Sequence, residues 1–179
     1  MFPFLIAAII LAAVAAWTDW RTGFIPNWLT FGVLGLAPIV HIVRAFSMGI
    51  EKDAALLEGG YSVLGAVVCG LVPWILFQKN AIGGGDVKVF AAIGALCQTM
   101  LGFEAEMYGF LAACLIAPAR LAYDGKLLRT LKNAVGLMIN PFMPKDKKVQ
   151  IEQEMLSWMR MGPAILLGTI IAAALHFRE

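Results

Sequence analysis

The chain has 179 residues, of which 60% are hydrophobic and only 15% are charged. Soluble domains carry about 25% charged and about 45–50% apolar residues, so this composition indicates an integral membrane protein rather than a soluble one. The net charge of +2 is too small to indicate a nucleic-acid partner, and no basic run is interleaved with aromatic residues.

Six apolar segments approach the length that crosses a bilayer. They cover residues 2–18, 28–44, 59–78, 86–101, 107–123 and 161–177. No Lys or Arg precedes the first segment, so we expect a retained membrane helix there and not a signal peptide. Between the segments we expect polar links at 20–27 and 79–85, an exposed loop at 46–58, an acidic link at 102–106 and a long polar loop at about 124–160. The sequence thus predicts an all-α integral membrane protein with six transmembrane helices, forming a single domain over residues 1–179.

Positive charges are divided unequally between the two sides of these spans. The side that holds the links after the first, third and fifth spans carries 11 of the 14 Lys and Arg residues, counting Lys88 and Arg120 at the span ends, and the other side carries Arg44, Lys52 and Arg178. Because cytoplasmic loops carry the excess of Lys and Arg, we expect a multi-pass protein of the inner (plasma) membrane with both termini outside. Asp19 and Asp86 then lie at the same, cytoplasmic, face.

The long loop contains apolar residues at helical spacing, interleaved with Lys126, Arg129 and Lys132. The apolar positions are Leu127, Leu128, Leu131, Val135, Met138 and Ile139. This pattern predicts a basic amphipathic helix that rests on membrane lipid at the inner leaflet. A second candidate covers residues 149–159, and a solvated linker is the alternative for both.

Two acids stand at the ends of predicted spans. Asp19 closes the first span, and Asp86 opens the fourth, directly after Gly83, Gly84 and Gly85. Such an acid can simply begin a helix and complement its dipole, but an ionisable group at a membrane helix is also a candidate functional residue. If the two carboxylates meet, they share a proton, and the pair can activate water against a peptide carbonyl. That chemistry needs neither a metal nor a covalent intermediate.

The remaining polar residues suggest other roles. We expect Glu51, Asp53, Glu58, Glu104 and Glu106 in outward loops. His41 and His176 fall towards the opposite face, so serine or cysteine hydrolysis is not favoured. Lys88 should turn away from Asp86 and reach the interface. Pro26 suits the start of the second span, and Asn27 either caps that span or bonds Asp19.

The cysteines predict no metal site. Cys69, Cys97 and Cys114 all lie in apolar segments and form no C-x-x-C pair, and the chain has only two histidines. Zinc-binding spacing is therefore missing, and we predict no metal and no cofactor.

The residues around both acids resemble a known family. Gly83-Gly84-Gly85-Asp86 fits the G-x-G-D signature of membrane aspartic proteases, and Asp19 with Ile25-Pro26-Asn27 resembles the other half of the prepilin peptidase pattern. Val87-Lys88, Ala91-Ala92-Ile93-Gly94 and the later Gly162-Pro163-Ala164-Ile165 with Gly168 are also similar to that family. The chain resembles its short form, which serves tight-adherence (Flp-type) pili. It departs from the pattern at Arg160-Met161, where the family often has Pro-Tyr.

The resemblance implies an aspartic endopeptidase with Asp19 and Asp86 as its catalytic residues. Gly83, Gly84, Gly85, Pro26 and Asn27 would position the backbone or the substrate. The partner would be a prepilin or pseudopilin precursor, which loses its short basic leader just before an apolar helix, with the pilus assembly machinery as a further partner. Longer members N-methylate the new amino terminus through a cytosolic segment with paired cysteines, so we do not expect methylation here.

Two other classes of function remain open. In a proton- or cation-coupled transporter, Asp19 and Asp86 would carry the ion, but both acids lie at one face and we expect no acid in the middle of a span. A non-catalytic membrane subunit of a pilus or secretion machine is the other alternative. Within the peptidase class, an archaeal preflagellin peptidase is a close variant.

Overall fold

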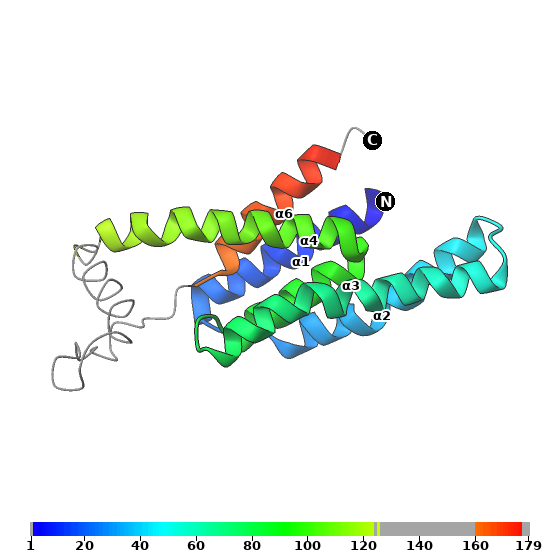
Figure 1. The fold of residues 1–179 in the computed structure, drawn as a ribbon, viewed down its shortest axis with the longest axis horizontal. Coiled ribbons are helices and arrows are strands. Elements are labelled where there is room, and N and C mark those ends of the chain that lie inside the picture. Colours follow the sequence, from blue (N-terminus) through cyan, green and yellow to red (C-terminus); the bar gives the residue numbers. More distant parts are fainter. Residues whose placement is uncertain (1, 124, 126–159, 177–179) are drawn as a thin grey trace, which may run out of the picture. The chain divides into compact units, whose positions relative to one another are not determined.

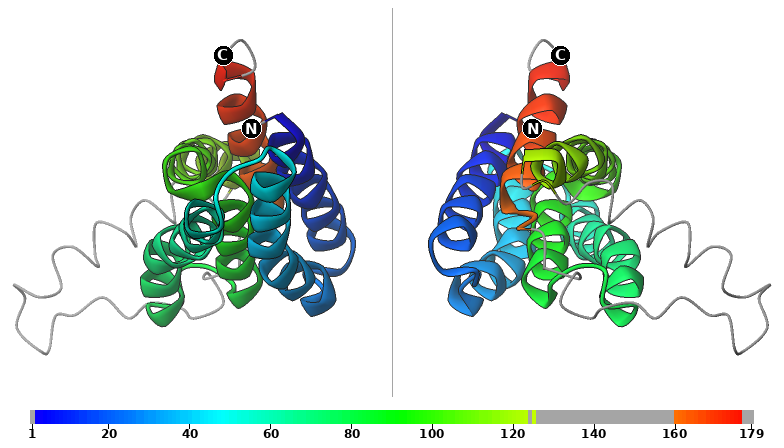
Figure 2. Two further views of the ribbon diagram at one scale, coloured as in Figure 1. Left: turned by 90° about the vertical axis from the view of Figure 1, so that its right-hand side faces the viewer. Right: turned by 90° about the vertical axis from the view of Figure 1, so that its left-hand side faces the viewer.

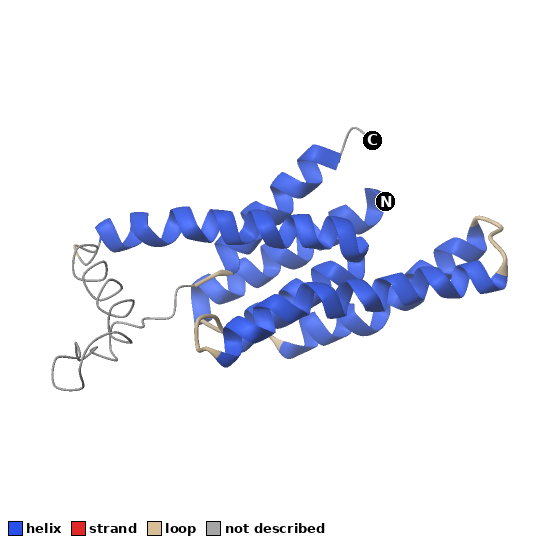
Figure 3. Cartoon of the chain, viewed as in Figure 1, coloured by secondary structure: helices blue, strands red, loops and turns tan. Residues whose placement is uncertain are grey.

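The computed structural model describes residues 2–123, 125 and 160–176, and every regular element in these ranges is an α-helix (Figures 1 and 3). The helices in chain order are α1 (Phe2–Thr22), α2 (Asn27–Ser47), α3 (Lys52–Gln78), α4 (Gly84–Tyr123) and α6 (Gly162–His176). The predicted all-α class is confirmed. The amphipathic helices predicted in the long loop lie outside the described residues.

The chain forms two compact units. The first comprises residues 1–113 and 160–179, and the second comprises residues 114–159. Of the second unit, the structure describes the last turns of α4 and Gly125. Asp19 and Asp86 both belong to the first unit. That the whole chain acts as one domain stays a prediction.

Four helices in the described ranges are long and apolar enough to cross a membrane. They are α1, α2, α3 and residues Gly84–Ala119 of α4. Apolar side chains stay exposed along them, with Trp28 of α2 at 74% and Val67 of α3 at 61%. Exposed apolar faces of this extent are suited to lipid, where each helix satisfies its own backbone hydrogen bonds. The chain is therefore a multi-pass membrane protein.

Helices of the first unit lie side by side, and some of them approach closely at small residues. α1 lies beside α6, and α2 lies beside α3 (Figures 1 and 2). A Cβ on Gly168 of α6 would overlap the backbone of Gly109 in α4, and a Cβ on Gly94 would lie 2.7 Å from the Cβ of Cys69 in α3. Such close approaches stabilise helix pairs in membranes, where the hydrophobic effect does not drive association.

α4 is broken at Gln98, whose φ of 60° and ψ of −173° are not helical, so α4 consists of two helices. The chain doubles back there, and a Cβ on Gly102 would lie 2.7 Å from the Cα of Gly94 (Figure 1). The prediction of a link at 102–106 is therefore wrong: the break comes earlier, and residues 102–106 are helical.

Side chains from other helices form hydrogen bonds with backbone carbonyl groups at this break. A helix end leaves its last carbonyl groups without intrahelical partners, and here two neighbouring helices supply donors. The bonds run from His41 Nε2 to the Leu96 carbonyl at 3.0 Å, and from Ser62 Oγ to the Ala95 carbonyl at 2.6 Å. His41 is buried and stacks on Phe4 with ring centroids 3.8 Å apart. This histidine therefore has a structural role.

The acids outside the candidate pair differ from expectation. α2 continues to Ser47 and α3 begins at Lys52, so most of the predicted loop at 46–58 is helical. Glu58 accepts a hydrogen bond from Gln98 Nε2 at 2.8 Å, and Glu104 pairs with His176 at 2.7 Å. The outward-loop prediction is wrong for Asp53, Glu58, Glu104 and Glu106, which all lie in helices.

Glu106 overturns a second expectation. It is only 2% exposed, and its Oε2 has no hydrogen-bond partner among the described residues. It lies within the apolar length of α4. The prediction that no acid lies inside a span is therefore wrong.

Candidate active site

The candidate site lies at one end of the first unit, where α1 and α3 end and where α2, α4 and α6 begin (Figure 1). Two short links close this end, at residues 23–26 and 79–83. Gly23, with φ of 67°, ends α1, and Asn80, with φ of 56°, follows α3. Residues with positive φ commonly terminate helices in this way. Both links thus turn back within a few residues and hold the helix ends together.

Asp19 lies in the last turn of α1 and is only 7% exposed. Its Oδ2 accepts a hydrogen bond from the backbone N–H of Gly162 at 3.0 Å. Gly162 is the first residue of α6, so the carboxylate sits at the positive end of that helix. Nearby, the guanidinium of Arg160 donates to the carbonyl of Trp20. The segment leading into α6 is therefore bound to the end of α1 at two points.

Asp86 is the third residue of α4 and is 6% exposed. Its Oδ2 accepts a hydrogen bond from the backbone N–H of Gly83 at 3.1 Å. A side chain that reaches back to the N–H preceding the helix is one half of a capping box. Asp86 thus stabilises the start of α4, and this bond also fixes the orientation of its carboxyl group.

The structure brings the two acids together. Asp19 lies close enough to Asp86 for its charge to act on that carboxyl group. Each carboxyl group is oriented by a backbone N–H from a helix start. Where two carboxyl groups come into contact, they resist double ionisation and share a proton. A pair that holds one proton can both accept and donate one, which is what acid–base catalysis on a peptide bond requires.

The glycines before Asp86 make room for the protein's own side chains. A Cβ on Gly84 would lie 3.3 Å from the ring of Phe77, and a Cβ on Gly85 would lie 3.2 Å from the Cβ of Ile25. Gly83 precedes α4, and its backbone N–H donates the hydrogen bond to the Asp86 carboxyl group. Whether these glycines also admit a substrate strand stays a prediction.

Asn27 differs from expectation, and its partner is Lys88. Pro26 occupies the capping position of α2 and Asn27 is its first residue, so the prediction that Asn27 caps the helix is wrong. Instead, Asn27 Oδ1 accepts a hydrogen bond from Lys88 Nζ at 2.8 Å. The same ammonium lies 5.1 Å from the centre of the Phe31 ring. Lys88 therefore connects the start of α4 to the start of α2.

Sequence reasoning missed the contact between Gly162 and Asp19. The Gly-Pro pair at the start of the last span is visible in the sequence, but 143 residues separate the bonded partners. No local pattern predicts a contact at that separation. No group of three His, Cys, Asp or Glu residues that could hold a metal ion occurs in the ranges the structure describes.

Comparison with known proteins places the site in a family. The model of the type IV leader peptidase family matches residues 6–119, which include both acids. Among curated proteins, the prepilin peptidase EppA of Methanothermobacter thermautotrophicus is 29% identical over 144 residues, which cover 76% of this chain and 32% of that protein.

Two bacterial relatives also match. The prepilin leader peptidase/N-methyltransferase of Vibrio cholerae is 26% identical over 99 residues, covering 55% of this chain and 36% of that protein. The Escherichia coli protein of the same name is 33% identical over 79 residues, covering 44% of this chain and 34% of that protein.

The chain thus spans about a third of the length of each of these relatives. No solved structure matches it. The family model nevertheless matches more than half of the chain, and the chain belongs to the type IV leader peptidase family.

Proposed function

We propose that this chain is a membrane aspartic endopeptidase that removes the short basic leader of a prepilin-like precursor. The observation that carries the proposal is the pairing of Asp19 and Asp86, both buried, at one end of the first unit. Both acids lie in the region that matches the leader peptidase family. The relatives are named prepilin peptidases, which supports a prepilin-like substrate.

In the proposed mechanism, one acid of the pair is ionised and the other carries the proton. The ionised carboxylate takes a proton from water as the water oxygen bonds to the carbonyl carbon of the scissile peptide. The protonated acid gives its proton to the carbonyl oxygen.

The tetrahedral intermediate then collapses and the C–N bond breaks. The leaving nitrogen takes the proton that came from water, and a hydroxyl of the intermediate returns a proton to the second acid, which restores the pair. We assign neither role to a particular aspartate, because a coupled pair titrates as one unit. Asp19 and Asp86 are at most 7% exposed as residues, so precursor binding must open this end of the unit before the cut.

The proposed topology has six spans: α1, α2, α3, the two helices of α4, and α6. The candidate site then lies on the cytoplasmic side and both termini lie outside. The distribution of 11 of the 14 positive charges on the site's side supports this orientation. A basic leader would stay on that side, with the scissile bond beside the aspartates and the apolar helix of the precursor in the lipid.

The proposal is tested with purified protein in lipid vesicles and a synthetic precursor that carries a short basic leader before an apolar helix. Mass spectrometry locates the cut. We expect a single cut ahead of the apolar helix, and none with Asp86→Asn. Correctly folded protein that cuts none of several precursors would contradict the proposal.

Glu106 favours a second candidate function, a proton- or cation-coupled transporter. A buried carboxyl group within an apolar helix is what an ion pathway through the membrane requires, and Glu106 is 2% exposed inside α4. The same vesicles separate the two candidates. A proton or cation flux that Glu106→Gln abolishes, without precursor cleavage by the wild type, would support transport.

A further inference from the structure

We infer that Lys88 is a positioning residue that acts through Asn27, holding the link after Asp19 against the helix that carries Asp86. The inference rests on the proposed peptidase function. The hydrogen bond on which it rests joins two residues that are 61 positions apart in the chain.

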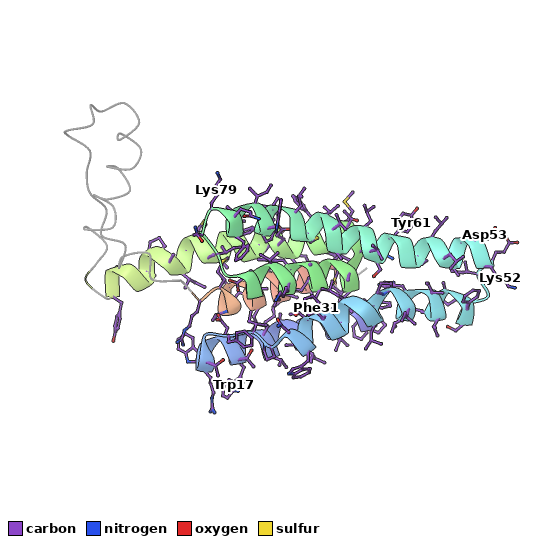
Figure 4. The ribbon with its side chains drawn as sticks, turned by 90° about the horizontal axis from the view of Figure 1, so that it is seen from below. Trp17, Phe31, Lys52, Asp53, Tyr61 and Lys79 are labelled. Carbon is purple, nitrogen blue, oxygen red and sulfur yellow. The ribbon has the colours of Figure 1, made fainter. Side chains whose placement is uncertain are left out.

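The polar contact joins two helix starts. Lys88 Nζ donates to Asn27 Oδ1 at 2.8 Å and lies 5.1 Å from the centre of the Phe31 ring. Phe31 is one helical turn beyond Asn27 on the same face of α2, and Figure 4 shows it on that part of the helix. The amide oxygen and the ring thus hold the ammonium from one face of the first turn of α2.

An apolar contact fixes the same link at a second point. Ile25 is 5% exposed, and the position of a Cβ on Gly85 would lie between 3.2 and 3.4 Å from three of its side-chain carbons. Gly85 directly precedes Asp86, and Lys88 follows two residues later. The link at 23–26 and the start of α2 are therefore held against α4 on both sides of Asp86. Ile25 packs on Gly85, and Asn27 accepts the hydrogen bond from Lys88. These two contacts together form the clamp.

These contacts also affect the position of Asp19, because the link between α1 and α2 is short. α1 ends at Thr22 and α2 begins at Asn27, and Gly23 turns the chain with φ of 67°. A displacement of the start of α2 is therefore transmitted to the end of α1, where Asp19 lies. Misplacing reacting groups by about 1 Å can lower a rate by about 10²-fold, so a hydrogen bond outside the acid pair can control its activity.

A double-mutant cycle tests this role with the precursor assay in lipid vesicles. We expect Lys88→Met and Asn27→Leu each to lower kcat by about tenfold, the scale of one hydrogen bond to a charged group, with KM unchanged. The double variant should lose no more than either single variant. Lys88→Arg and Asn27→Asp keep a donor and an acceptor and should retain most of the activity. Lys79→Met, at the exposed end of α3 (Figure 4), is the matched control.

Two outcomes of the cycle would overturn the inference. If the losses multiply to about 10²-fold in the double variant, the two residues act independently. If Lys88→Met lowers activity while Asn27→Leu does not, the ammonium acts by its charge and not through Asn27.

A cross-linking experiment keeps the inference separate from the proposed function. In a Cys114→Ser background, which removes the exposed cysteine, the Asn27→Cys/Lys88→Cys variant in membranes should react with a short bis-maleimide, and mass spectrometry should find residues 27 and 88 joined. Absence of this product in folded protein would overturn the clamp. If the product forms but the wild type cuts no precursor, the proposed function fails and the positioning role of Lys88 in cleavage fails with it, while the contact itself stands.

Discussion

Two regions of the first unit bury polar side chains, and they do so in opposite ways. At the break in α4, His41 and Ser62 each donate a hydrogen bond to a carbonyl that the helix leaves unpaired. Each buried donor there has an acceptor. At the candidate site, two acids lie near each other, and each carboxyl group is oriented by a backbone N–H. Folding requires hydrogen-bond partners for buried polar groups, whereas two acids kept near each other in a buried place mark a candidate functional site.

Apart from changes to the two aspartates themselves, the largest effect should come from Gly162→Ala at the site. An added Cβ would lie 2.8 Å from the Cα of Ala16 and 3.0 Å from Asp19 Oδ2, so α6 or Asp19 must move. A shift of about 1 Å should lower kcat by about 10²-fold, measured with the precursor assay. The control is Gly32→Ala in α2, where an added Cβ meets nothing within 4 Å. Equal activity of the two variants would show that the contact with α6 does not position Asp19.

A smaller effect, on stability alone, should follow from His41→Leu at the break. The Leu96 carbonyl loses its donor in a buried place, which should cost about 1–3 kcal/mol. Thermal unfolding in detergent should show a lower Tm, while the folded fraction keeps its cleavage rate. Loss of cleavage with an unchanged Tm would break the distinction between the two regions.

Ser62→Ala should have a still smaller effect in the same region. It removes the bond to the Ala95 carbonyl at 2.6 Å and should lower stability by about 1 kcal/mol. Ser47→Ala is the matched control, because Ser47 bonds the Arg44 carbonyl at an exposed helix end. There the change should stay within about 0.5 kcal/mol. A larger loss for Ser47→Ala than for Ser62→Ala would contradict the structural role assigned to the break.

Metal removal should have no effect on cleavage. The proposed mechanism draws its acid and its base from the aspartate pair, so incubation with EDTA should leave the rate of precursor cleavage unchanged. Inactivation by EDTA that zinc reverses would show that the pair does not act alone.

The helix ends around the two acids were easier to predict from the sequence than the break in α4. Each acid stands within a few residues of Gly, Pro or Asn residues that mark a helix end. Gly23, Pro26 and Asn27 follow Asp19, and three glycines precede Asp86. Gln98 carries no such mark, and the acids at 104 and 106 suggested a link that does not form. Glu104 is accommodated in a helix because His176 pairs with it, and a tertiary contact of that kind leaves no local pattern.

Contacts across the chain explain the other differences. The residue type of Asn27 suggests a helix cap. However, Pro26 occupies the capping position, and the side chain of Asn27 accepts a hydrogen bond from Lys88 instead. The charges at Lys52 and Asp53 suggested a loop. They instead begin the 27-residue α3, which is longer than the roughly 20 residues a bilayer requires, so its charged first turn can extend beyond the lipid (Figure 4).

The most direct test of the central claim compares Asp19→Asn, Asp86→Asn and their double variant with the wild type in the precursor assay, with Asp53→Asn as control. The two-acid account predicts that each site variant loses at least about 10²-fold in rate, since acid–base catalysis contributes about 10²–10⁴-fold. It also predicts that the double variant is no worse than either single variant, and that Asp53→Asn equals the wild type. A single site variant that keeps the wild-type rate would contradict the account.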